Sequence, residues 1–195
     1  MDIELIAFDL DGTLIEFNLP FDRIRKEIGI KKRFILESIM EMDGERKKRA
    51  LEVLKRYEIE SAKEARPMYF ASELLEALER EGILKGVVTR NSRESVKIVS
   101  ERFGFKFDFV ITREDTEPKP SPKPIILALK MFDVKPRRAL TVGDFLFDLM
   151  AGKKAGTKTA LILTPKNKEM TREFYTYADY VFKSLKELAK FVGVV

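Results

Sequence analysis

Short apolar runs, rich in β-branched residues, recur along the chain and predict buried strands. Five of them cover residues 3–10, 84–89, 107–112, 139–143 and 159–163, and a weaker run at 180–182 is typical of an edge strand. The runs are short and mostly apolar, which favours strands that are covered on both faces.

Helical patterns lie between these runs, at residues 72–81, 92–103, 122–132, 145–155 and 184–192. Ser92 is a good cap residue, Gly82 and Gly104 stop the helices that precede them, and SLKE from Ser184 is a capping box. Strands that alternate with helices predict βαβ units, and hence an α/β fold whose parallel sheet has helices on both faces.

Residues 16–66 break this alternation. They contain no strand-like run but three amphipathic segments, FDRIRKEIG, KKRFILESIMEMD and GERKKRALEVLKRYE, followed by a capping-box sequence, SAKE, at 61–64. We expect three or four short helices above the carboxyl end of the first strand. The predicted organisation is a core domain of residues 1–15 and 67–195 with a small helical cap, residues 16–66, inserted after the first strand.

The chain has no cysteine and no histidine. These absences exclude disulfides, thiolate nucleophiles, serine–histidine triads and imidazole-bound zinc. Any catalysis must therefore rely on carboxylates, lysines, hydroxyls and a bound metal. Such a metal would have mainly oxygen ligands, which favours Mg²⁺, Ca²⁺ or Mn²⁺.

A net charge of +5 raises the question of nucleic-acid binding. However, the 37 basic residues are interspersed with 32 acidic ones, and the basic runs at 31–33 and 46–49 lack the interleaved aromatic residues of a stacking surface. We interpret these runs as solvated helix faces and expect no nucleic-acid partner.

No apolar run reaches the roughly 18 to 20 residues of a membrane span, and the first residues lack the basic region of a signal peptide. The sequence therefore predicts a cytoplasmic protein without a membrane partner. Abundant lysine, arginine and glutamate, with no glutamine or tryptophan, is a composition typical of thermophiles.

Polar residues gather where the predicted strands end, which is where sites form in an open parallel sheet. In chain order they are Asp9, Asp11, Gly12 and Thr13 after the first strand, Thr89, Arg90 and Asn91 after the second, Lys119 and Lys123 beyond the third, and Asp144 and Asp148 after the fourth. Each signal alone is common in turns or on surfaces. Their occurrence at four successive strand ends predicts one shared site.

The aspartates of this set should converge. In the stretch DLD, the alternation of a strand puts Asp9 and Asp11 on one face. Asp144 adds a third carboxylate, and Asp148 follows one helical turn later. Carboxylates this close repel each other unless a cation lies near them. Mg²⁺ fits, because it binds one or two carboxylates, waters and phosphate oxygens.

The same positions resemble the four motifs of the haloacid dehalogenase superfamily: DLDGT at 9–13, Thr89, KPSP at 119–122 and GDFLFD at 143–148. The first and fourth motifs are the specific ones. A helical insertion directly after the first motif is similar to the first cap class, and the chain most resembles phosphoglycolate-phosphatase-type hydrolases. The resemblance implies a Rossmann-like α/β core with a small helical cap.

The resemblance also implies roles for the residues around the reacting phosphate. Asp9 would be the nucleophile that forms an aspartyl phosphate, and Asp11 would be the general acid and then the general base. Thr89 would hold a phosphoryl oxygen, with help from backbone N–H groups near Gly12 and Asn91.

The remaining residues would balance charge and hold Mg²⁺. Lys119 would offset the charge of the nucleophile and the phosphate, and Lys123, which also precedes a proline, is the alternative. Asp144 would ligate Mg²⁺ together with the nucleophile and the backbone carbonyl of Asp11, and Asp148 would steady this metal site.

The leading hypothesis is a magnesium-dependent phosphatase, a monomer or homodimer, that hydrolyses a small phosphorylated metabolite. The alternatives are a phosphomutase of sugar phosphates and a pyrophosphatase, with a haloacid dehalogenase or a non-catalytic basic binding module less favoured. Arg23, Arg25 and Lys26 are candidates to contact an anionic leaving group, although a solvated helix face is the simpler interpretation. Residues 145–147 predict an apolar wall, and the substrate itself stays open.

Overall fold

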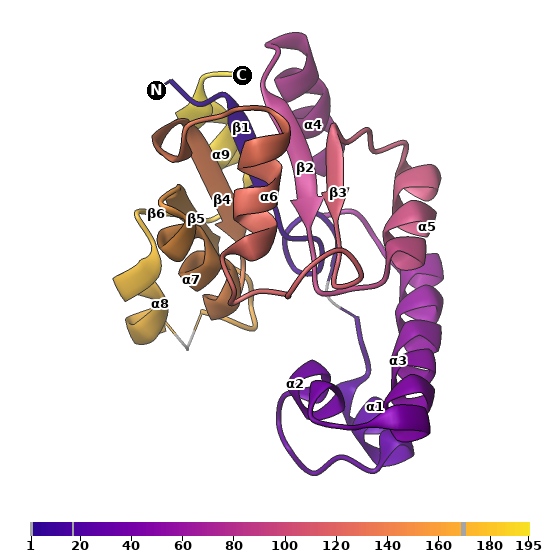
Figure 1. The fold of residues 1–195 in the computed structure, drawn as a ribbon. Coiled ribbons are helices and arrows are strands. Elements are labelled where there is room, and N and C mark those ends of the chain that lie inside the picture. The colour runs from indigo at the N-terminus through magenta and orange to yellow at the C-terminus, as the bar shows by residue number, and fades with distance from the viewer. Residues whose placement is uncertain (1, 17, 169–170) are drawn as a thin grey trace.

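The core of the protein is one parallel sheet of six strands (Figure 1). The computed structural model describes residues 2–16, 18–168 and 171–195. The strands are β1 (Leu5–Phe8), β2 (Leu84–Val88), β3 (Phe109–Ile111), β4 (Ala139–Gly143), β5 (Lys158–Ile162) and β6 (Tyr180–Phe182). Their order is β3-β2-β1-β4-β5-β6, and every neighbouring pair is parallel. The expected parallel sheet is confirmed, with the weak run at 180–182 as an edge strand.

Helices cover both faces of this sheet. One face carries α4 (Ala71–Arg80), α5 (Arg93–Phe103) and α9 (Leu185–Val192), and the other carries α6 (Lys123–Met131) and α7 (Leu146–Ala155). The short helix α8 (Thr171–Tyr177) packs on α7, and one turn of 3-10 helix, η1 (Pro136–Arg138), precedes β4. In the described parts of the chain, no helix has both the length and the apolarity to cross a membrane.

The central strand β1 is buried on both faces. Ile6 and Phe8 pack in the cluster that includes α4, α5 and α9, whereas Leu5 and Ala7 pack in the cluster that includes α6. Side chains alternate between the faces of a strand, so a strand covered on both faces must be apolar throughout. The first charged residue after this strand, Asp9, follows directly where β1 ends.

The ends of the elements differ from the predicted ends by a few residues. β1 covers Leu5–Phe8 rather than 3–10, because the chain turns at Leu10, whose carbonyl accepts hydrogen bonds from three N–H groups that follow it. Helix α6 begins at Lys123, one residue later than predicted. Ser92 and Ser184 cap α5 and α9 as expected, since each hydroxyl accepts a hydrogen bond from the backbone N–H three residues later.

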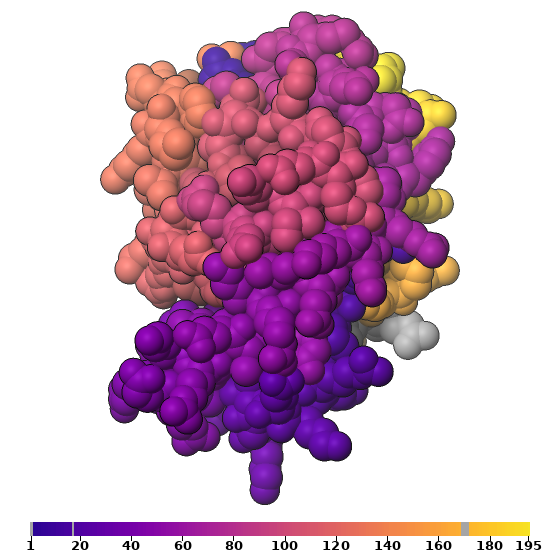
Figure 2. Space-filling view, turned by 90° about the vertical axis from the view of Figure 1, so that its right-hand side faces the viewer, coloured from indigo at the N-terminus to yellow at the C-terminus, as the bar shows by residue number. Residues whose placement is uncertain are grey.

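The cap contains three helices, α1 (Phe21–Ile28), α2 (Ile35–Met40) and α3 (Gly44–Glu64). They lie beyond the carboxyl ends of the strands (Figure 1), and their indigo and purple residues form the lower lobe in Figure 2. These helices have a hydrophobic cluster of their own, which consists of Ile24, Ile35, Leu36, Ile39, Ala50 and Leu54 with partly buried neighbours.

Two details predicted for the cap are wrong. The SAKE sequence at 61–64 does not begin a helix but ends α3, which runs for 21 residues because no glycine or proline interrupts it after Gly44. The basic run at 31–33 lies in the loop between α1 and α2, because Gly29 ends α1 in a left-handed conformation. The run at 46–49 does lie on α3, largely exposed.

Two paired segments of chain join the cap to the core. The N–H of Glu16 donates to the carbonyl of Arg66 at 2.9 Å, and the N–H of Met68 donates to the carbonyl of Leu14 at 2.9 Å. Between these bonds, Ile15 forms an isolated bridge with the chain that returns from the cap. The paired segments lie beside the proposed domain boundaries at residues 16 and 66, which stay a prediction.

The C-terminal part of α3 is anchored on the core. It packs along α5, and Ala62 and Ala65 belong to the main hydrophobic cluster. Arg102 of α5 donates to the carbonyls of these two alanines at 2.6 and 3.0 Å. Lys55 of α3 also pairs with Glu94 at 2.8 Å. The long helix α3, on which α1 and α2 pack, is therefore fixed to the core at its C-terminal end.

Candidate active site

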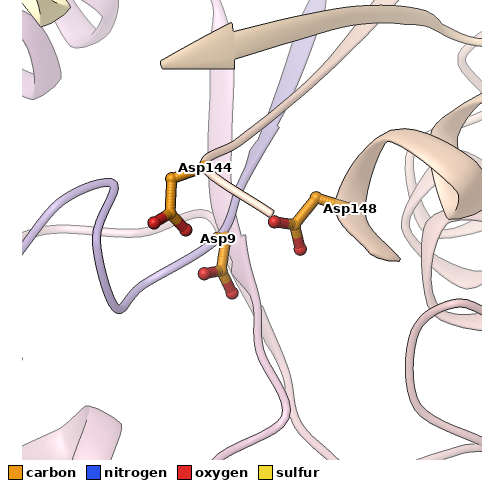
Figure 3. A group of neighbouring side chains, drawn as sticks. All are labelled: Asp9, Asp144 and Asp148. Atoms are coloured by element: carbon orange, nitrogen blue, oxygen red, sulfur yellow. The ribbon is translucent and has the colours of Figure 1, made fainter. Parts of the chain in front are cut away.

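Three aspartates meet at the carboxyl edge of the sheet (Figure 3). Asp9 follows β1, Asp144 follows β4, and Asp148 lies in the first turn of α7. Because β1 and β4 are neighbouring parallel strands, their ends lie side by side. Each residue contributes a carboxylate oxygen that lies within 4.8 Å of the others. The structure thus brings these three predicted residues together.

Lys119 lies among these carboxylates. Its Nζ is 2.6 Å from Oδ1 of Asp9 and 2.6 Å from Oδ1 of Asp148, and its side chain is 2% exposed. Lys123, the alternative, lies at the surface, where it pairs with Glu117 at 2.8 Å. Of the two lysines, the structure places Lys119 at the site.

Asp11 faces the loop that follows β2. Nδ2 of Asn91 donates to Oδ2 of Asp11 at 2.5 Å. Thr89 is buried, and its hydroxyl accepts a hydrogen bond from the N–H of Asn91 at 3.2 Å. The cluster of three aspartates does not include the Asp11 carboxylate. In this structure the Asn91 side chain orients Asp11, and the phosphate contact expected from the backbone N–H near Asn91 stays a prediction.

Gly12 has a steric role that the sequence did not suggest. Its φ is +82°, and a Cβ at this position would lie 2.2 Å from Oδ2 of Asp144. Its N–H donates to the carbonyl of Ile15 at 2.7 Å. A phosphate contact from the backbone near Gly12 stays a prediction. Glycine is needed here because the turn approaches the Asp144 carboxylate closely and in a left-handed conformation.

Burial and mutual repulsion raise the pKa values of three carboxyl groups, those of Asp9, Asp11 and Asp144. Burial raises the pKa of Asp9 to about 6 against the opposing effect of Lys119. Burial, with the charge of Asp9, raises the pKa of Asp11 to about 7. The pKa of Asp144 is raised by burial and by its neighbours Asp9 and Asp148. Burial alone would lower the pKa of Lys119, but the adjacent carboxylates outweigh it and raise that pKa.

The aspartate cluster fits a divalent cation. Lys119 pairs with Asp9 and Asp148, and the three carboxylates, one buried and two partly buried, still outnumber it, so the cluster carries excess negative charge. Carboxylate oxygens that approach from three elements are ligands that Mg²⁺ accepts. Asp9, Asp144 and Asp148 would hold such an ion, which would in turn stabilise their ionised forms.

The raised pKa of Asp11 predicts how stability depends on pH. Because folding raises this pKa from 3.8 to about 7, the folded chain binds the proton more tightly than the unfolded chain. The contribution of Asp11 to stability is therefore complete below about pH 4 and is lost as the pH rises through about 7. Asp11→Asn is neutral at every pH. It should match the wild type near pH 4 and exceed it near pH 8 by up to about 4 kcal/mol in free energy of unfolding.

Urea unfolding in excess chelator, at several pH values, measures this difference. Asp22→Asn is the matched control, because the Asp22 side chain is 98% exposed and pairs only with Arg25 in the same helix. If the difference in free energy of unfolding between Asp11→Asn and the wild type stays constant or shrinks as the pH rises, the pKa assigned to Asp11 is contradicted.

A glycine substitution tests the close approach to Asp144. Gly12→Ala and Gly104→Ala both place alanine at a positive φ, +82° and +67°, and each should lose roughly 1 kcal/mol of stability. A Cβ at Gly104 meets nothing within 4 Å, whereas at Gly12 it displaces the Asp144 carboxylate. We therefore expect only Gly12→Ala to weaken Mg²⁺ binding, by about tenfold or more. Equal Mg²⁺ dissociation constants for the two variants, measured by titration calorimetry, would refute the steric role.

Asn167, in the loop after β5, is a site residue that sequence reasoning missed. It is 3% exposed. Its Nδ2 donates to the carbonyls of Asp144 at 2.7 Å and Ile162 at 2.9 Å, and its Oδ1 accepts from the N–H of Thr164 at 2.8 Å. Asn167 therefore fixes the backbone of a proposed metal ligand. The available signal was a polar residue just beyond a fifth strand end.

Arg90 joins the cap to the site. Its guanidinium donates to both carboxylate oxygens of Glu37 in α2, at 2.7 and 2.8 Å, and to the carbonyl of Lys119 at 3.1 Å. It also lies 5.0 Å from the ring centroid of Phe147, which is 5.2 Å from the ring of Phe34 in the cap. The strand-end position of Arg90 was visible in the sequence, but nothing there indicated its distant partners.

A buried ion pair makes a second link between cap and core. Glu58 of α3 pairs with Arg113, and both side chains are at most 5% exposed. Glu58 also accepts a hydrogen bond from the N–H of Ser92 at 3.0 Å, and Arg113 donates to the carbonyl of Arg90 at 2.9 Å. Burial raises the pKa of Glu58, and Arg113 opposes the shift. The loop after β2 is thus tied to α3.

A cavity of about 790 Å³ lies between the cap and the core. The core side includes the predicted site residues Asp9, Asp11, Thr89, Asn91, Asp144 and Asp148, together with Phe145 and Phe147. The cap side includes Phe21, Arg23, Arg25, Arg33 and Phe34. Of the three basic residues considered for a leaving group, Arg23 and Arg25 line the cavity and Lys26 does not. The apolar wall expected from residues 145–147 is formed by the two phenylalanines.

Comparisons with known proteins agree with this geometry. Residues 16–162 match the family model described as haloacid dehalogenase-like hydrolase. The chain is 30% identical to pyrophosphatase PpaX of Bacillus velezensis, over 98% of this chain and 97% of the relative. It is 31% identical to phosphoglycolate phosphatase of Aquifex aeolicus, over 83% of this chain and 85% of the relative.

A solved structure extends the agreement to three dimensions. The structure of CbbY from Rhodobacter sphaeroides in complex with phosphate superimposes with a TM-score of 0.72 at 26% identity, over 95% of this chain and 96% of that one. The family match covers well over half of the chain, and it includes the second, third and fourth motif positions. The protein is therefore an enzyme that belongs to the haloacid dehalogenase-like hydrolase family.

Proposed function

We propose that this enzyme is a magnesium-dependent phosphatase that hydrolyses a phosphate monoester through an aspartyl phosphate. The observation that carries the proposal is the contact of Lys119 with Asp9, at 2.6 Å, in a cavity that Asp11 also lines. A fixed lysine favours the ionised form of one carboxylate, which suits a nucleophile. A second carboxyl group with a pKa of about 7 suits an acid that must also act as a base.

In the first step, an oxygen of Asp9 forms a bond to phosphorus while the bond from phosphorus to the alcohol oxygen breaks. Asp11 is protonated in a large fraction of molecules near neutral pH, and it gives this proton to the departing oxygen. Asn91 holds the Asp11 carboxyl group in place through Nδ2. The products are the free alcohol and an aspartyl phosphate at Asp9.

In the second step, a water molecule attacks phosphorus and Asp11 takes its proton. The bond from phosphorus to Asp9 breaks, which releases inorganic phosphate and restores the carboxylate. Lys119 and the Thr89 hydroxyl would contact the phosphoryl oxygens in both steps. Mg²⁺, held by Asp9, Asp144 and the carbonyl of Asp11 with Asp148 in support, would supply the positive charge that phosphoryl transfer requires.

The relatives support phosphate chemistry but differ in substrate. One is named phosphoglycolate phosphatase, another pyrophosphatase, and the CbbY structure holds phosphate. The similarity to PpaX along nearly the whole chain makes pyrophosphate hydrolysis the second candidate. The same aspartates would serve that reaction, because pyrophosphate also offers a phosphoryl group on an oxygen leaving group.

A phosphate-release screen tests the proposal. The panel contains phosphoglycolate, sugar phosphates, nucleotides and pyrophosphate, each with Mg²⁺ and with excess chelator. We expect Mg²⁺-dependent release from at least one monoester. Isomerised sugar phosphate without net phosphate release would establish a phosphomutase instead, and activity on a chlorinated acid in chelator would establish a dehalogenase.

A further inference from the structure

We propose that the preferred substrate is a phosphate monoester whose alcohol carries an aromatic ring, and that Phe34 of the cap and Phe147 of α7 bind that ring. The inference rests on the phosphatase activity proposed above and names its substrate class. It is carried by the size of the cavity, by the closed position of the cap and by the rings that line the space beside the phosphate site.

The cap already touches the core at the mouth of the cavity. Glu37 of α2 holds Arg90 through two hydrogen bonds, and Phe34 packs against Phe147 with ring centroids 5.2 Å apart. In addition, Glu58 of α3 pairs with a buried arginine of the core. The cavity volume therefore applies to a conformation in which the cap already contacts the core.

The remaining volume is too large for a two-carbon or inorganic substrate. About 790 Å³ falls in the range of pockets that enclose a drug-sized molecule, roughly 300 to 1,000 Å³. Phosphoglycolate or pyrophosphate would occupy a small part of it and leave the cap side empty. A substrate that reaches from Asp9 to the cap needs a leaving group much larger than glycolate.

The chemistry of the walls selects the kind of leaving group. Phe147 lines the same cavity as the carboxylate cluster, and Phe145 packs edge-on against the Phe147 ring with centroids 5.1 Å apart. Phe34 completes this wall from the cap although it is 38% exposed, and Phe21, also a lining residue, is 39% exposed. Large rings left accessible inside a cavity gain free energy when an apolar or aromatic group covers them.

Basic residues of the same wall suit the π-system and the negative charge of such a substrate. The Arg90 guanidinium lies over the Phe147 ring at 5.0 Å, and that of Arg33 lies over the Phe34 ring at 5.4 Å. Planar guanidinium groups that flank phenyl rings can also stack on an aromatic ligand. Phosphate at Asp9 and a ring at the Phe34–Phe147 contact therefore use both the charged and the aromatic lining of the cavity.

Matched pairs of substrates test the proposal without a change in leaving-group chemistry. The first pair is 2-phenylethyl phosphate and ethyl phosphate, and the second is uridine 5′-monophosphate and ribose 5-phosphate. All four release a primary alcohol, so a difference within a pair reports the ring. We expect kcat/KM to be about tenfold or more higher for the ring-bearing member of at least the first pair.

Binding provides a readout that does not depend on turnover. We expect 2-phenylethylphosphonate, which cannot be hydrolysed, to bind about tenfold more tightly than ethylphosphonate in titration calorimetry with Mg²⁺. Phe34→Ala and Phe147→Ala should each reduce this preference severalfold. Met40→Ala is the control and should keep it, because Met40 is an equally exposed apolar residue of the cap, 40%, that does not line the cavity.

The possible outcomes separate the two proposals. Equal affinities for the two phosphonates, or a higher kcat/KM for phosphoglycolate or pyrophosphate than for 2-phenylethyl phosphate, would overturn the ring site. A preference for the aromatic phosphonate that Met40→Ala reduces as much as Phe34→Ala does would also overturn it. If no monoester releases phosphate while the phosphonate preference holds, the phosphatase proposal fails and the ring site stands.

Discussion

Replacing Asp9 by asparagine is expected to reduce Mg²⁺-dependent phosphate release by roughly a thousandfold or more. An amide cannot form the bond to phosphorus that the proposed first step requires. No neighbouring carboxylate can take over this role as nucleophile. Asp11 is held by Asn91, and Asp148 is occupied by Lys119 and by the N–H of Phe145 at 3.0 Å.

The fold of Asp9→Asn should survive, because the substitution is isosteric and Lys119 keeps its contact with Asp148. Circular dichroism and the unfolding midpoint check this expectation. Asp22→Asn is the matched control, since Asp22 also lines the cavity but is 98% exposed, and it should keep nearly full activity. A folded Asp9→Asn enzyme with more than about a tenth of the wild-type rate would exclude Asp9 as the nucleophile.

Lys119→Met should abolish activity and also lower the free energy of unfolding by roughly 3 to 5 kcal/mol near pH 8. The lysine is 2% exposed and is shared between Asp9 and Asp148, so its loss leaves buried carboxylates without a positive partner. Lys119 opposes the rise in the pKa of Asp9, so without it that pKa moves above about 6. The penalty should therefore shrink as the pH falls toward about 5 and Asp9 becomes neutral.

Urea unfolding in chelator, at about pH 8 and about pH 5, measures this penalty. Lys123→Met is the matched control: Lys123 is four residues away and 64% exposed, and its pair with Glu117 should contribute about 1 kcal/mol or less. Addition of Mg²⁺ should recover part of the stability lost by Lys119→Met. Equal destabilisation by the two substitutions, or a Lys119 penalty that grows toward low pH, would show that the lysine does not neutralise the cluster.

The fold could be predicted because its signals are local. The run IELIAFDL is apolar on both faces because β1 lies in the centre of the sheet, between α4, α5 and α9 on one side and α6 on the other. Ser92 and Ser184 indicate where α5 and α9 begin, because their own hydroxyls cap these helices. The ends of the elements were predicted less closely, because the residue at which β1 stops depends on the turn that follows it.

The structure of the cap shows where local signals mislead. SAKE has the residues of a capping box, but a capping box forms only where its first residue is a non-helical N-cap. In α3 the helix continues through this sequence, and Ala62 is buried in the main hydrophobic cluster. Tertiary packing, rather than the local sequence pattern, therefore determines that α3 continues through residues 61–64.

The site was predictable to the extent that its residues follow strand ends. Asp9, Asp144 and Asp148 follow strand ends, where sites form in a parallel α/β sheet, and they come together because β1 and β4 are neighbours in the structure. Glu37 follows no strand end, and for Asn167 a place beyond the fifth strand was the available signal. Their roles depend on where α2 and the loop after β5 lie in space, and no spacing in the sequence records that placement.

The most direct test of the proposed mechanism is rapid-quench peptide mass spectrometry during a single turnover with Mg²⁺ and an active substrate from the screen. We predict that the peptide containing Asp9 transiently gains the mass of one phosphoryl group. This gain should be absent in excess chelator and in Asp9→Asn. Release of phosphate at the wild-type rate with no phosphorylated Asp9 peptide at any time, or with the label on another residue, would contradict the account.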